Sequence, residues 1–285
     1  MAASLNVSEG SDTFVEVFPI ISPGYLTVYD WEVVELTDLR RWVGQNWKVS
    51  IYASVIYVIL IYLGQSWMKN RPAYNLRSWL TSWNIVLALF SLIGFARTFP
   101  EIWHVINEPH GFYISVCTRQ EHNAATACWG FLMTMSKLIE LGDTAFIVLR
   151  KQPLRFLHWY HHITVFIYTW STYEDYEPSL RWFMTMNMAV HALMYTYYTL
   201  RAMRVRVPRQ FAMIVTCLQI SQMIFGVFIN LYTVWVKRNG HDCVRRDEVI
   251  QLALLMYVSY FILFANFFYQ SYLKSSPKSL KQKQK

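Results

Sequence analysis

Three histidines within five residues have the type and spacing for acid–base, nucleophilic or metal chemistry. His158, His161 and His162 stand directly before the apolar run 163–168. Positions i, i+3 and i+4 of a helix share one face, so this spacing predicts imidazoles that point the same way. A polar side chain in an apolar span costs roughly 2.5 kcal/mol or more. We therefore expect chemistry or metal binding here, with a satisfied polar cluster at a helix end as the structural alternative.

Polar side chains also recur at helical spacing in three other apolar segments. The three groups are Lys137, Glu140, Asp143 and Thr144; Asn187, His191, Tyr195 and Tyr198; and Thr216, Gln219 and Gln222. Lys137 and Glu140 can neutralise each other across one helical turn. Inward-pointing faces of this kind would enclose a polar chamber next to an apolar interior. A purely structural ion pair and interhelical hydrogen bonding by Gln and Thr remain alternatives.

The elements that must position these groups are membrane helices. The chain has 285 residues, of which 54% are hydrophobic and only 15% charged, whereas a soluble domain has about 25% charged residues. Apolar runs of about 20 residues predict membrane spans. We expect seven, over residues 47–68, 79–99, 127–149, 157–173, 181–200, 211–236 and 250–273. The predicted fold class is all-α, a polytopic membrane protein with one domain over 47–273, between a lead-in, 1–46, and a basic tail, 274–285.

The net charge of +8 is concentrated in the turns after the first, third and fifth spans and in the tail. This distribution follows the positive-inside rule and excludes a nucleic-acid-binding patch as its explanation. It predicts a luminal N-terminus and a cytosolic C-terminus. The tail segment 281–285 has lysines third and fifth from its end, which resembles a dilysine-type retrieval signal of the endoplasmic reticulum. A solvated basic tail is an equally good interpretation of that segment.

Two features of the predicted luminal segments agree with this orientation. Asn6 begins an Asn-Val-Ser sequon, which predicts glycosylation. Cys117 and Cys243 fall in the predicted luminal loops 100–126 and 237–249. An oxidising lumen permits a disulfide between them, although two free thiols are also compatible with the sequence.

Clustered histidines raise the possibility of a membrane di-iron oxygenase. A site of that type needs about eight histidines on the cytosolic side, and the whole chain contains eight. Four of them lie in predicted luminal loops, namely His104, His110, His122 and His241. Too few remain for two irons, and the nearby carboxylates have Lys137 as a competing partner. We therefore expect no metal.

Histidine as a nucleophile is the alternative chemistry. Neutral imidazole attacks thioesters to give a reactive acyl-imidazole, and a neighbouring histidine can orient it or move protons. A polar chamber that continues into an apolar interior suits an amphiphile with a reactive head group and a long acyl chain. No cysteine stands beside a histidine in a catalytic arrangement.

The polar motifs together resemble the four signatures of the very-long-chain fatty acid elongases, the ELO family of 3-oxoacyl-CoA synthases. In order they are Lys137-x-x-Glu140-x-x-Asp143-Thr144, His158-x-x-His161-His162, His191-x-x-Met194-Tyr195-x-Tyr197-Tyr198 and Thr216-x-x-Gln219-x-x-Gln222. The resemblance covers roughly residues 35–275. The segments 159–160 and 182–187 look most like the subgroup that uses saturated and monounsaturated long-chain acyl-CoA.

The resemblance implies a fold, a reaction and partners. The fold is seven helices in the endoplasmic reticulum membrane, six of them around a closed-ended tunnel. The reaction condenses a long-chain acyl-CoA with malonyl-CoA to a 3-oxoacyl-CoA two carbons longer, with release of CO2 and CoA and without a cofactor. Besides these substrates and membrane lipid, the implied partners are the reductases and the dehydratase of the elongation cycle, and a homo-oligomer is possible.

Roles for individual residues follow from the same resemblance. His161 is the expected nucleophile, His191 its partner, and His158 and His162 complete the catalytic group. The expected substrate-binding residues are Lys137, Glu140, Asp143, Thr144, Asn187, Tyr195, Tyr198, Gln219 and Gln222, with Arg150 and Arg201 for CoA phosphates. The positive-inside bias alone also accounts for the two arginines. The competing function classes are a di-iron fatty-acyl oxygenase or desaturase and a non-enzymatic seven-helix lipid carrier or receptor.

Overall fold

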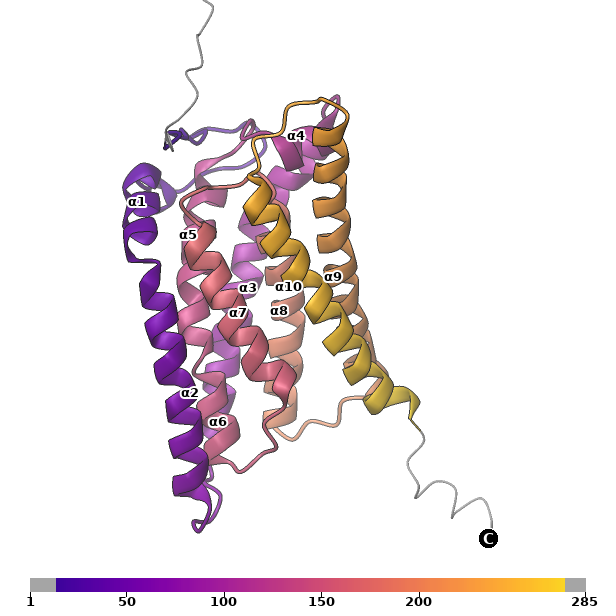
Figure 1. Ribbon diagram of the computed structural model, residues 1–285. Helices are drawn as coiled ribbons and strands as arrows, with labels where there is room; N and C mark the ends of the chain where they lie inside the picture. Colours follow the sequence, from indigo (N-terminus) through magenta and orange to yellow (C-terminus); the bar gives the residue numbers. More distant parts are fainter. Residues whose placement is uncertain (1–13, 275–285) are drawn as a thin grey trace, which may run out of the picture.

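Long helices run antiparallel, side by side, in the computed structural model, which describes residues 14–274 (Figure 1). Asn6 and the lysines of segment 281–285 therefore lie outside the described residues. The α-helices are α1 (Leu36–Asn46), α2 (Lys48–Met68), α3 (Arg77–Ile106), α4 (Gly111–Cys117), α5 (Ala124–Glu140), α6 (Asp143–Leu149), α7 (Phe156–Thr172), α8 (Leu180–Ala202), α9 (Arg209–Arg238) and α10 (Asp247–Phe268). A 3-10 helix, η1 (Asp30–Glu32), precedes α1, and a π-helical turn, η2 (Tyr269–Leu273), follows α10. Extended pairing in the described residues is limited to one isolated bridge, Ile20–Asn123, so the all-α prediction is confirmed.

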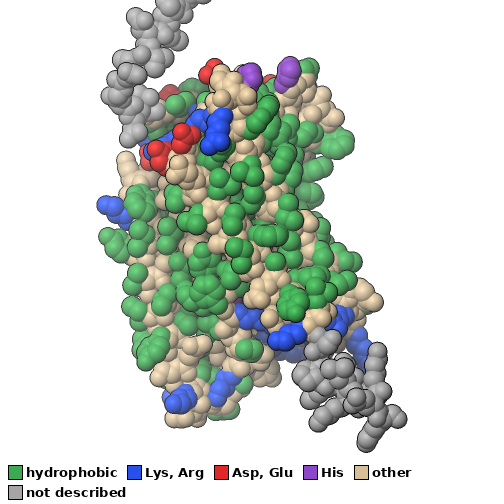
Figure 2. Space-filling view, turned by 45° about the vertical axis from the view of Figure 1, so that its right-hand side comes forward, with side chains coloured by type: hydrophobic (Ala, Val, Ile, Leu, Met, Phe, Trp, Pro, Cys, Tyr) green, Lys and Arg blue, Asp and Glu red, His purple; other side chains and the backbone are tan. Residues whose placement is uncertain are grey.

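Four helices in the described part of the chain are long and apolar enough to cross a membrane. They are α2, α3, α9 and the continuous segment Asp247–Leu273, which joins α10 to η2. Exposed apolar side chains cover the flanks of the bundle, Tyr62, Trp79 and Leu255 among them (Figure 2). These features support a multi-pass membrane protein. The helices α5 and α7 have 17 residues each and α8 is rich in polar groups, so the count of seven spans stays a prediction.

The third predicted span, 127–149, is wrong as a single helix. It is broken at residues 141–142, between α5 and α6. A side chain at Gly142 would place its Cβ 3.0 Å from the ring of Trp83, so the glycine allows a close approach to α3. The Trp83 indole then donates a hydrogen bond to the carboxylate of Asp143 at 2.5 Å. This contact joins the start of α6 to α3, a distant part of the chain.

The predicted luminal loop 100–126 is also partly helical. Helix α3 continues through Pro100 to Ile106, and α4 follows after a short turn. Glu101, on the extended part of α3, is fully buried and accepts hydrogen bonds from the backbone of Asn123 at 2.9 Å and the ring of His122 at 3.0 Å. Arg181 also pairs with this carboxylate at 3.3 Å. Together these contacts satisfy a buried charge and stabilise the additional helical turns.

The lead-in contains a helix that the sequence analysis did not predict. Helix α1 occupies residues 36–46 and contacts α5 and α7. Its Arg40 is buried, and the guanidinium donates to the carbonyl oxygens of Val15 at 2.7 Å and Glu174 at 2.6 Å. The arginine therefore joins the lead-in to the turn that precedes α8.

The two ends of the bundle differ in chemistry. We call one the basic end; it contains the turns 69–76, 150–155 and 203–208, and Lys and Arg side chains gather there (Figures 1 and 2). We call the other the disulfide end; it contains α4 and the α9–α10 loop, where Cys117 and Cys243 are joined in a disulfide. The described part of the chain begins at the disulfide end and finishes at the basic end (Figure 1).

Candidate active site

A cavity of about 290 Å³ lies between α5–α6, α7, α8, α9 and α10. We call it the histidine cavity, because four histidines line it. The predicted site residues in its wall are His158, His161, His162, His191, Glu140, Asp143, Asn187, Tyr195, Tyr198, Gln219 and Gln222. Residues scattered over more than eighty positions of sequence thus meet at one site.

The α7 histidines form a contiguous group of rings. The ring centroids of His158 and His162 are 4.5 Å apart, and those of His161 and His162 are 5.7 Å apart. His158 Nε2 lies 3.0 Å from the hydroxyl of Thr144. No residue among 14–274 makes a hydrogen bond to the His161 ring. Its imidazole therefore keeps its nitrogen lone pair for a ligand.

A buried charge network joins α5 to α8 behind the histidines. Lys137 Nζ donates to Glu140 Oε1 at 2.7 Å and to Asn187 Oδ1 at 3.0 Å. The Asn187 amide nitrogen lies 3.2 Å from His191 Nε2, and His191 Nδ1 lies 3.9 Å from Glu140 Oε1. The ion pair predicted from the i, i+3 spacing is present, and its carboxylate also faces the imidazole of His191. The network fixes the position of His191 relative to α5.

Asp143 and Thr144, at the start of α6, are held by aromatic residues of three helices. Asp143 accepts hydrogen bonds from Trp83 at one carboxylate oxygen and from the Tyr195 hydroxyl, at 2.8 Å, at the other. The hydroxyls of Thr144 and Tyr57 are 2.6 Å apart. The sequence analysis missed Trp83 and Tyr57, because single aromatic residues in α2 and α3 have no spacing that separates them from lipid-facing ones.

The α9 residues contribute unevenly. Gln219 and Gln222 line the histidine cavity, and the Gln219 amide donates to the sulfur of Met194 at 3.3 Å. Thr216 instead donates to a carbonyl of its own helix at 3.0 Å and lies 3.3 Å from the hydroxyl of Tyr272 in η2. The regular spacing by three therefore places two of these three side chains at the site.

Arg150 and Arg201 lie in a neighbouring cavity of about 360 Å³, toward the basic end. We call it the side chamber; besides these arginines it is lined by Leu80, Asn84, Phe146 and Ile147. It shares wall residues with the histidine cavity, namely Asp143, His158, Tyr195 and Tyr198. The predicted cationic residues thus border a chamber that adjoins the histidine cavity and has His158 in its wall.

A third, narrower cavity of about 70 Å³ extends from His161 toward the disulfide end. We call it the apolar cavity; its wall includes Val165, Leu180, Phe183, Met256 and Tyr257. It shares His161, Asn187, Gln222 and Met223 with the histidine cavity. Of the four clustered histidines, all in the described part of the chain, only His161 borders both cavities.

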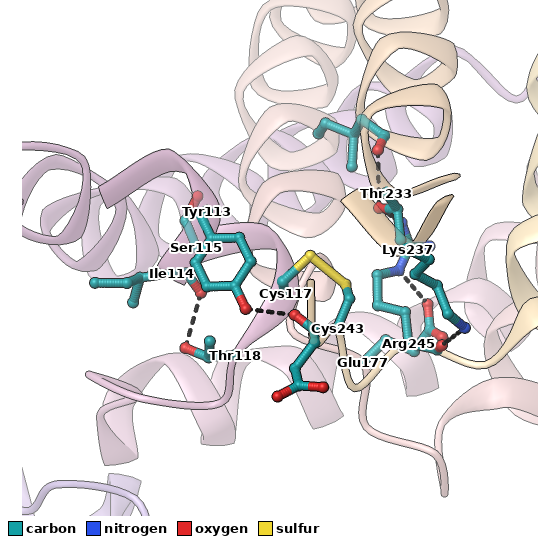
Figure 3. Close-up of a disulfide and its surroundings, with 12 residues drawn as sticks. Tyr113, Ile114, Ser115, Cys117, Thr118, Glu177, Thr233, Lys237, Cys243 and Arg245 are labelled. Atoms are coloured by element: carbon teal, nitrogen blue, oxygen red, sulfur yellow. Dashed lines mark hydrogen bonds and ion pairs between the residues drawn. A yellow bond between two sulfur atoms is a disulfide. The ribbon is translucent and has the colours of Figure 1, made fainter. Parts of the chain in front are cut away.

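Glu177 lines the apolar cavity, and its partner Arg245 lies near the disulfide (Figure 3). Arg245 is almost fully buried, and its guanidinium donates to Glu177 at 2.8 Å, Asn230 at 2.9 Å and Thr233 at 3.0 Å. Burial raises the pKa of Glu177 above its usual value, although Arg245 opposes that shift. The pairing of Cys117 with Cys243 holds the loop that contains Arg245 against α4.

A comparison with protein families decides the identity of the chain. The family model described as ELO: GNS1/SUR4 family matches residues 42–280. The chain belongs to the ELO family. The predicted resemblance is therefore confirmed, and the residues that match include the whole of the histidine cavity.

Curated members of the ELO family are similar over most of the chain. Very long chain fatty acid elongase 6 of Drosophila melanogaster is 46% identical over 258 residues, 89% of this chain and 81% of the relative. Very long chain fatty acid elongase 6 of Mus musculus is 42% identical over 243 residues, 85% and 91% of the two chains. Very long chain fatty acid elongase 3 of Homo sapiens is 38% identical over 283 residues, 98% of each.

Proposed function

We propose that this ELO-family protein is the condensing enzyme of fatty acid elongation, a 3-oxoacyl-CoA synthase. It joins a long-chain acyl-CoA to malonyl-CoA and gives a 3-oxoacyl-CoA two carbons longer. Family membership and relatives named very long chain fatty acid elongases support this proposal. The observation that carries it is the place of His161 between the histidine cavity and the apolar cavity. A thioester whose carbonyl meets that imidazole has an apolar space for its tail.

The first half-reaction transfers the acyl group to His161. An imidazole nitrogen attacks the thioester carbonyl, the C–N bond forms and the C–S bond breaks. CoA leaves as a thiolate and takes the imidazole proton. The free ring of His161 suits a nucleophile, and the adjacent His158 and His162 are placed to orient it and to move the proton.

The second half-reaction forms the new carbon–carbon bond. Malonyl-CoA loses CO2, and the electron pair of the broken C–C bond becomes an enolate. The enolate carbon attacks the acyl carbonyl, and the C–N bond to His161 breaks. The imidazole takes up a proton, and our scheme assigns this proton transfer to His191. The amides of Asn187, Gln219 and Gln222 line the cavity and supply donors for the developing oxyanion.

The remaining predicted residues position these groups and bind CoA. Lys137 and Glu140 hold Asn187 and His191, while Asp143 and Thr144 tie Tyr195 and His158 to α6. Arg150 and Arg201 border the side chamber at the basic end, where guanidinium groups suit CoA phosphates. No metal and no bound cofactor enters this scheme. Among residues 14–274, no group of three or more His, Cys, Asp or Glu side chains is arranged to hold a metal ion.

We also propose the cellular setting that the sequence predicts. Seven helices span the endoplasmic reticulum membrane, six of them around a closed-ended tunnel made of the histidine and apolar cavities. The disulfide lies at the end opposite the basic turns, which supports a luminal disulfide end and a cytosolic basic end. Substrates are saturated and monounsaturated long-chain acyl-CoA, and the product passes to the reductases and the dehydratase of the cycle.

A condensation assay tests the proposed function. Microsomes with the wild type or His161→Ala receive labelled malonyl-CoA and a series of acyl-CoA. The wild type should incorporate label, and His161→Ala should lose about a thousandfold or more of that activity, since removal of a nucleophile abolishes the covalent route. His241→Ala is the matched control, because His241 is an exposed residue of the α9–α10 loop. No incorporation by the wild type with any acyl-CoA would overturn the proposal.

A further inference from the structure

The side chamber adjoins the histidine cavity and has one of its histidines, His158, in its wall. It lies between α3, α6 and α8 and opens toward the basic end beside Arg150 and Arg201. The histidine cavity approaches the basic end separately, between α7 and α10, where Arg155 packs over the ring of Phe267 at 4.6 Å. The two routes meet at Asp143 and His158.

The two routes differ in what they reach. The histidine cavity shares four wall residues with the apolar cavity, as described above. The side chamber and the apolar cavity have no wall residue in common among the described residues. A ligand in the side chamber therefore meets His158, and the apolar cavity is not part of the chamber's own wall. This geometry suits a thioester with a short acyl group, which needs no apolar space of its own.

Asn84 is a polar side chain of the side chamber that the proposed mechanism does not use. It lies on α3, is 3% exposed, and its amide makes no hydrogen bond to any residue among 14–274. The amide lines the cavity, where a ligand can reach it, and α3 is one of the apolar helices that fit a membrane span. A ligand that forms hydrogen bonds with the Asn84 amide accounts for a polar side chain at this position of an apolar helix.

The walls of the chamber indicate the chemistry of that ligand. The Asn84 amide offers one donor and one acceptor group, which match the amides of a pantetheine arm. Leu80, Phe146 and Ile147 cover the flexible part of such an arm, and the guanidinium groups at the rim suit phosphates. Asp143, which also lines the chamber, is held by hydrogen bonds from Trp83 and Tyr195.

We propose that the side chamber is the binding site for malonyl-CoA, with Asn84 bonded to the pantetheine arm. Acyl-CoA uses the other route, through the histidine cavity, and places its tail in the apolar cavity. The malonyl group then meets the acyl group at His161 from the side of α3 and α8. This inference rests on the proposed function and adds to it a separate seat for each substrate.

Separate measurement of the two half-reactions tests the inference. Acyl transfer is followed as the mass increase of the intact protein with acyl-CoA alone, and condensation is followed with both substrates. Asn84→Leu removes the amide at similar volume. It should raise the KM for malonyl-CoA about tenfold, as expected for one lost hydrogen bond in a buried site. The rate of acyl transfer and the KM for acyl-CoA should stay within about twofold of the wild type.

Two further variants complete the design. Ser91→Ala removes another buried polar group of α3 that lines none of the three cavities, and it should change neither half-reaction. Leu157→Trp narrows the histidine cavity outside the side chamber, and it should slow acyl transfer more than it raises the KM for malonyl-CoA. Melting temperatures of all variants verify that each one folds.

The outcomes separate this inference from the function on which it rests. An unchanged KM for malonyl-CoA in Asn84→Leu, or an equal loss in both half-reactions, would overturn the malonyl-CoA site. Condensation by the wild type without any acyl adduct would contradict only the acyl-imidazole intermediate. In that case the inference would still be tested by comparing the change in the KM for malonyl-CoA with the change in the KM for acyl-CoA. Absence of condensation would contradict the proposed function itself.

Discussion

At the scale of single residues, the position of His161 distinguishes it from its neighbours. Spacing in the sequence makes His158, His161 and His162 equivalent members of one helix face. In the structure, His158 is engaged by Thr144, whereas the ring of His161 borders the apolar cavity. The nucleophile assigned by resemblance is thus also the histidine that a long acyl group can reach from the apolar side.

The Lys137–Glu140 pair provides a test of the charge network at this scale. Lys137→Met leaves the buried carboxylate of Glu140 without its cation, and breaking a buried pair costs about 3–5 kcal/mol. We expect a large loss of stability in denaturation of the detergent-solubilised protein. Lys137→Met combined with Glu140→Met should recover most of that loss, because no unpaired charge remains. The double variant should stay inactive, since Asn187 and His191 lose their partners; recovery of activity would show that the pair is only structural.

Arg245 provides a second test, with a defined pH dependence. Burial already raises the pKa of Glu177 above 4.5. Arg245→Met removes the cation that pairs with this carboxyl group, so the pKa of Glu177 should rise further. A raised carboxyl pKa means that the folded state binds the proton more tightly than the unfolded state. Stability is then retained at acidic pH and lost as the pH rises through the folded pKa.

The measurement compares the unfolding midpoints of Arg245→Met and the wild type at about pH 5 and about pH 7.5. We expect the variant to be destabilised at both, and more so at the higher pH. Arg238→Met, at an exposed position at the end of α9, should show no such trend. If the difference in unfolding midpoint between Arg245→Met and the wild type grew as the pH falls, it would contradict a raised pKa of Glu177.

At the scale of elements, the break between α5 and α6 shows how the packing of α3 against Gly142 positions Asp143 at the active site. The sequence predicts helix through residues 127–149 because its apolar content is continuous. The structure interrupts it where Gly142 admits Trp83, and that indole holds Asp143. Glu140 therefore ends α5, whereas Thr144 lies in α6, although both side chains were predicted on one face of a single helix. Local periodicity cannot contain this information, because the decisive contact comes from α3.

Gly142→Ala tests the role of the break. The added Cβ would lie 3.0 Å from the Trp83 ring and 3.1 Å from a backbone oxygen. Overpacking of this kind costs about 1–3 kcal/mol, and displacement of Trp83 weakens its bond to Asp143. We expect a lower melting temperature together with at least about tenfold lower condensation activity. Gly24→Ala, which meets nothing within 4 Å, should behave as the wild type; full activity of Gly142→Ala would show that the close approach is dispensable.

At the scale of the whole molecule, the disulfide joins α4 to the α9–α10 loop across 126 positions of sequence. A covalent link over so long a segment restricts the unfolded chain strongly, and typical disulfides contribute about 2–4 kcal/mol. The same link holds the loop of Arg245, which pairs with Glu177 in the wall of the apolar cavity. The two halves of the bundle are thus coupled at the end away from the basic turns.

Removal of the disulfide should lower stability without abolishing the site. We expect Cys117→Ser, Cys243→Ser and the double variant to share one reduced melting temperature, because each lacks the same bond. A reductant should lower the melting temperature of the wild type to that level and leave the double variant unchanged. Cys217→Ser, at an exposed free thiol, is the control. Additive effects of the two single variants would contradict a bond between them.

The sequence by itself determined what depends on local composition and spacing. Apolar runs specified helices close to their observed bounds, the i, i+3 spacing identified the Lys137–Glu140 pair, and four motifs identified the ELO family. Tertiary structure alone decided which of these groups meet and how the cavities connect. Trp83 and Asn84 became recognisable only there. The physical reason is that each acts through a neighbour on another helix, and the choice of neighbouring helices follows from packing between residues far apart in the chain.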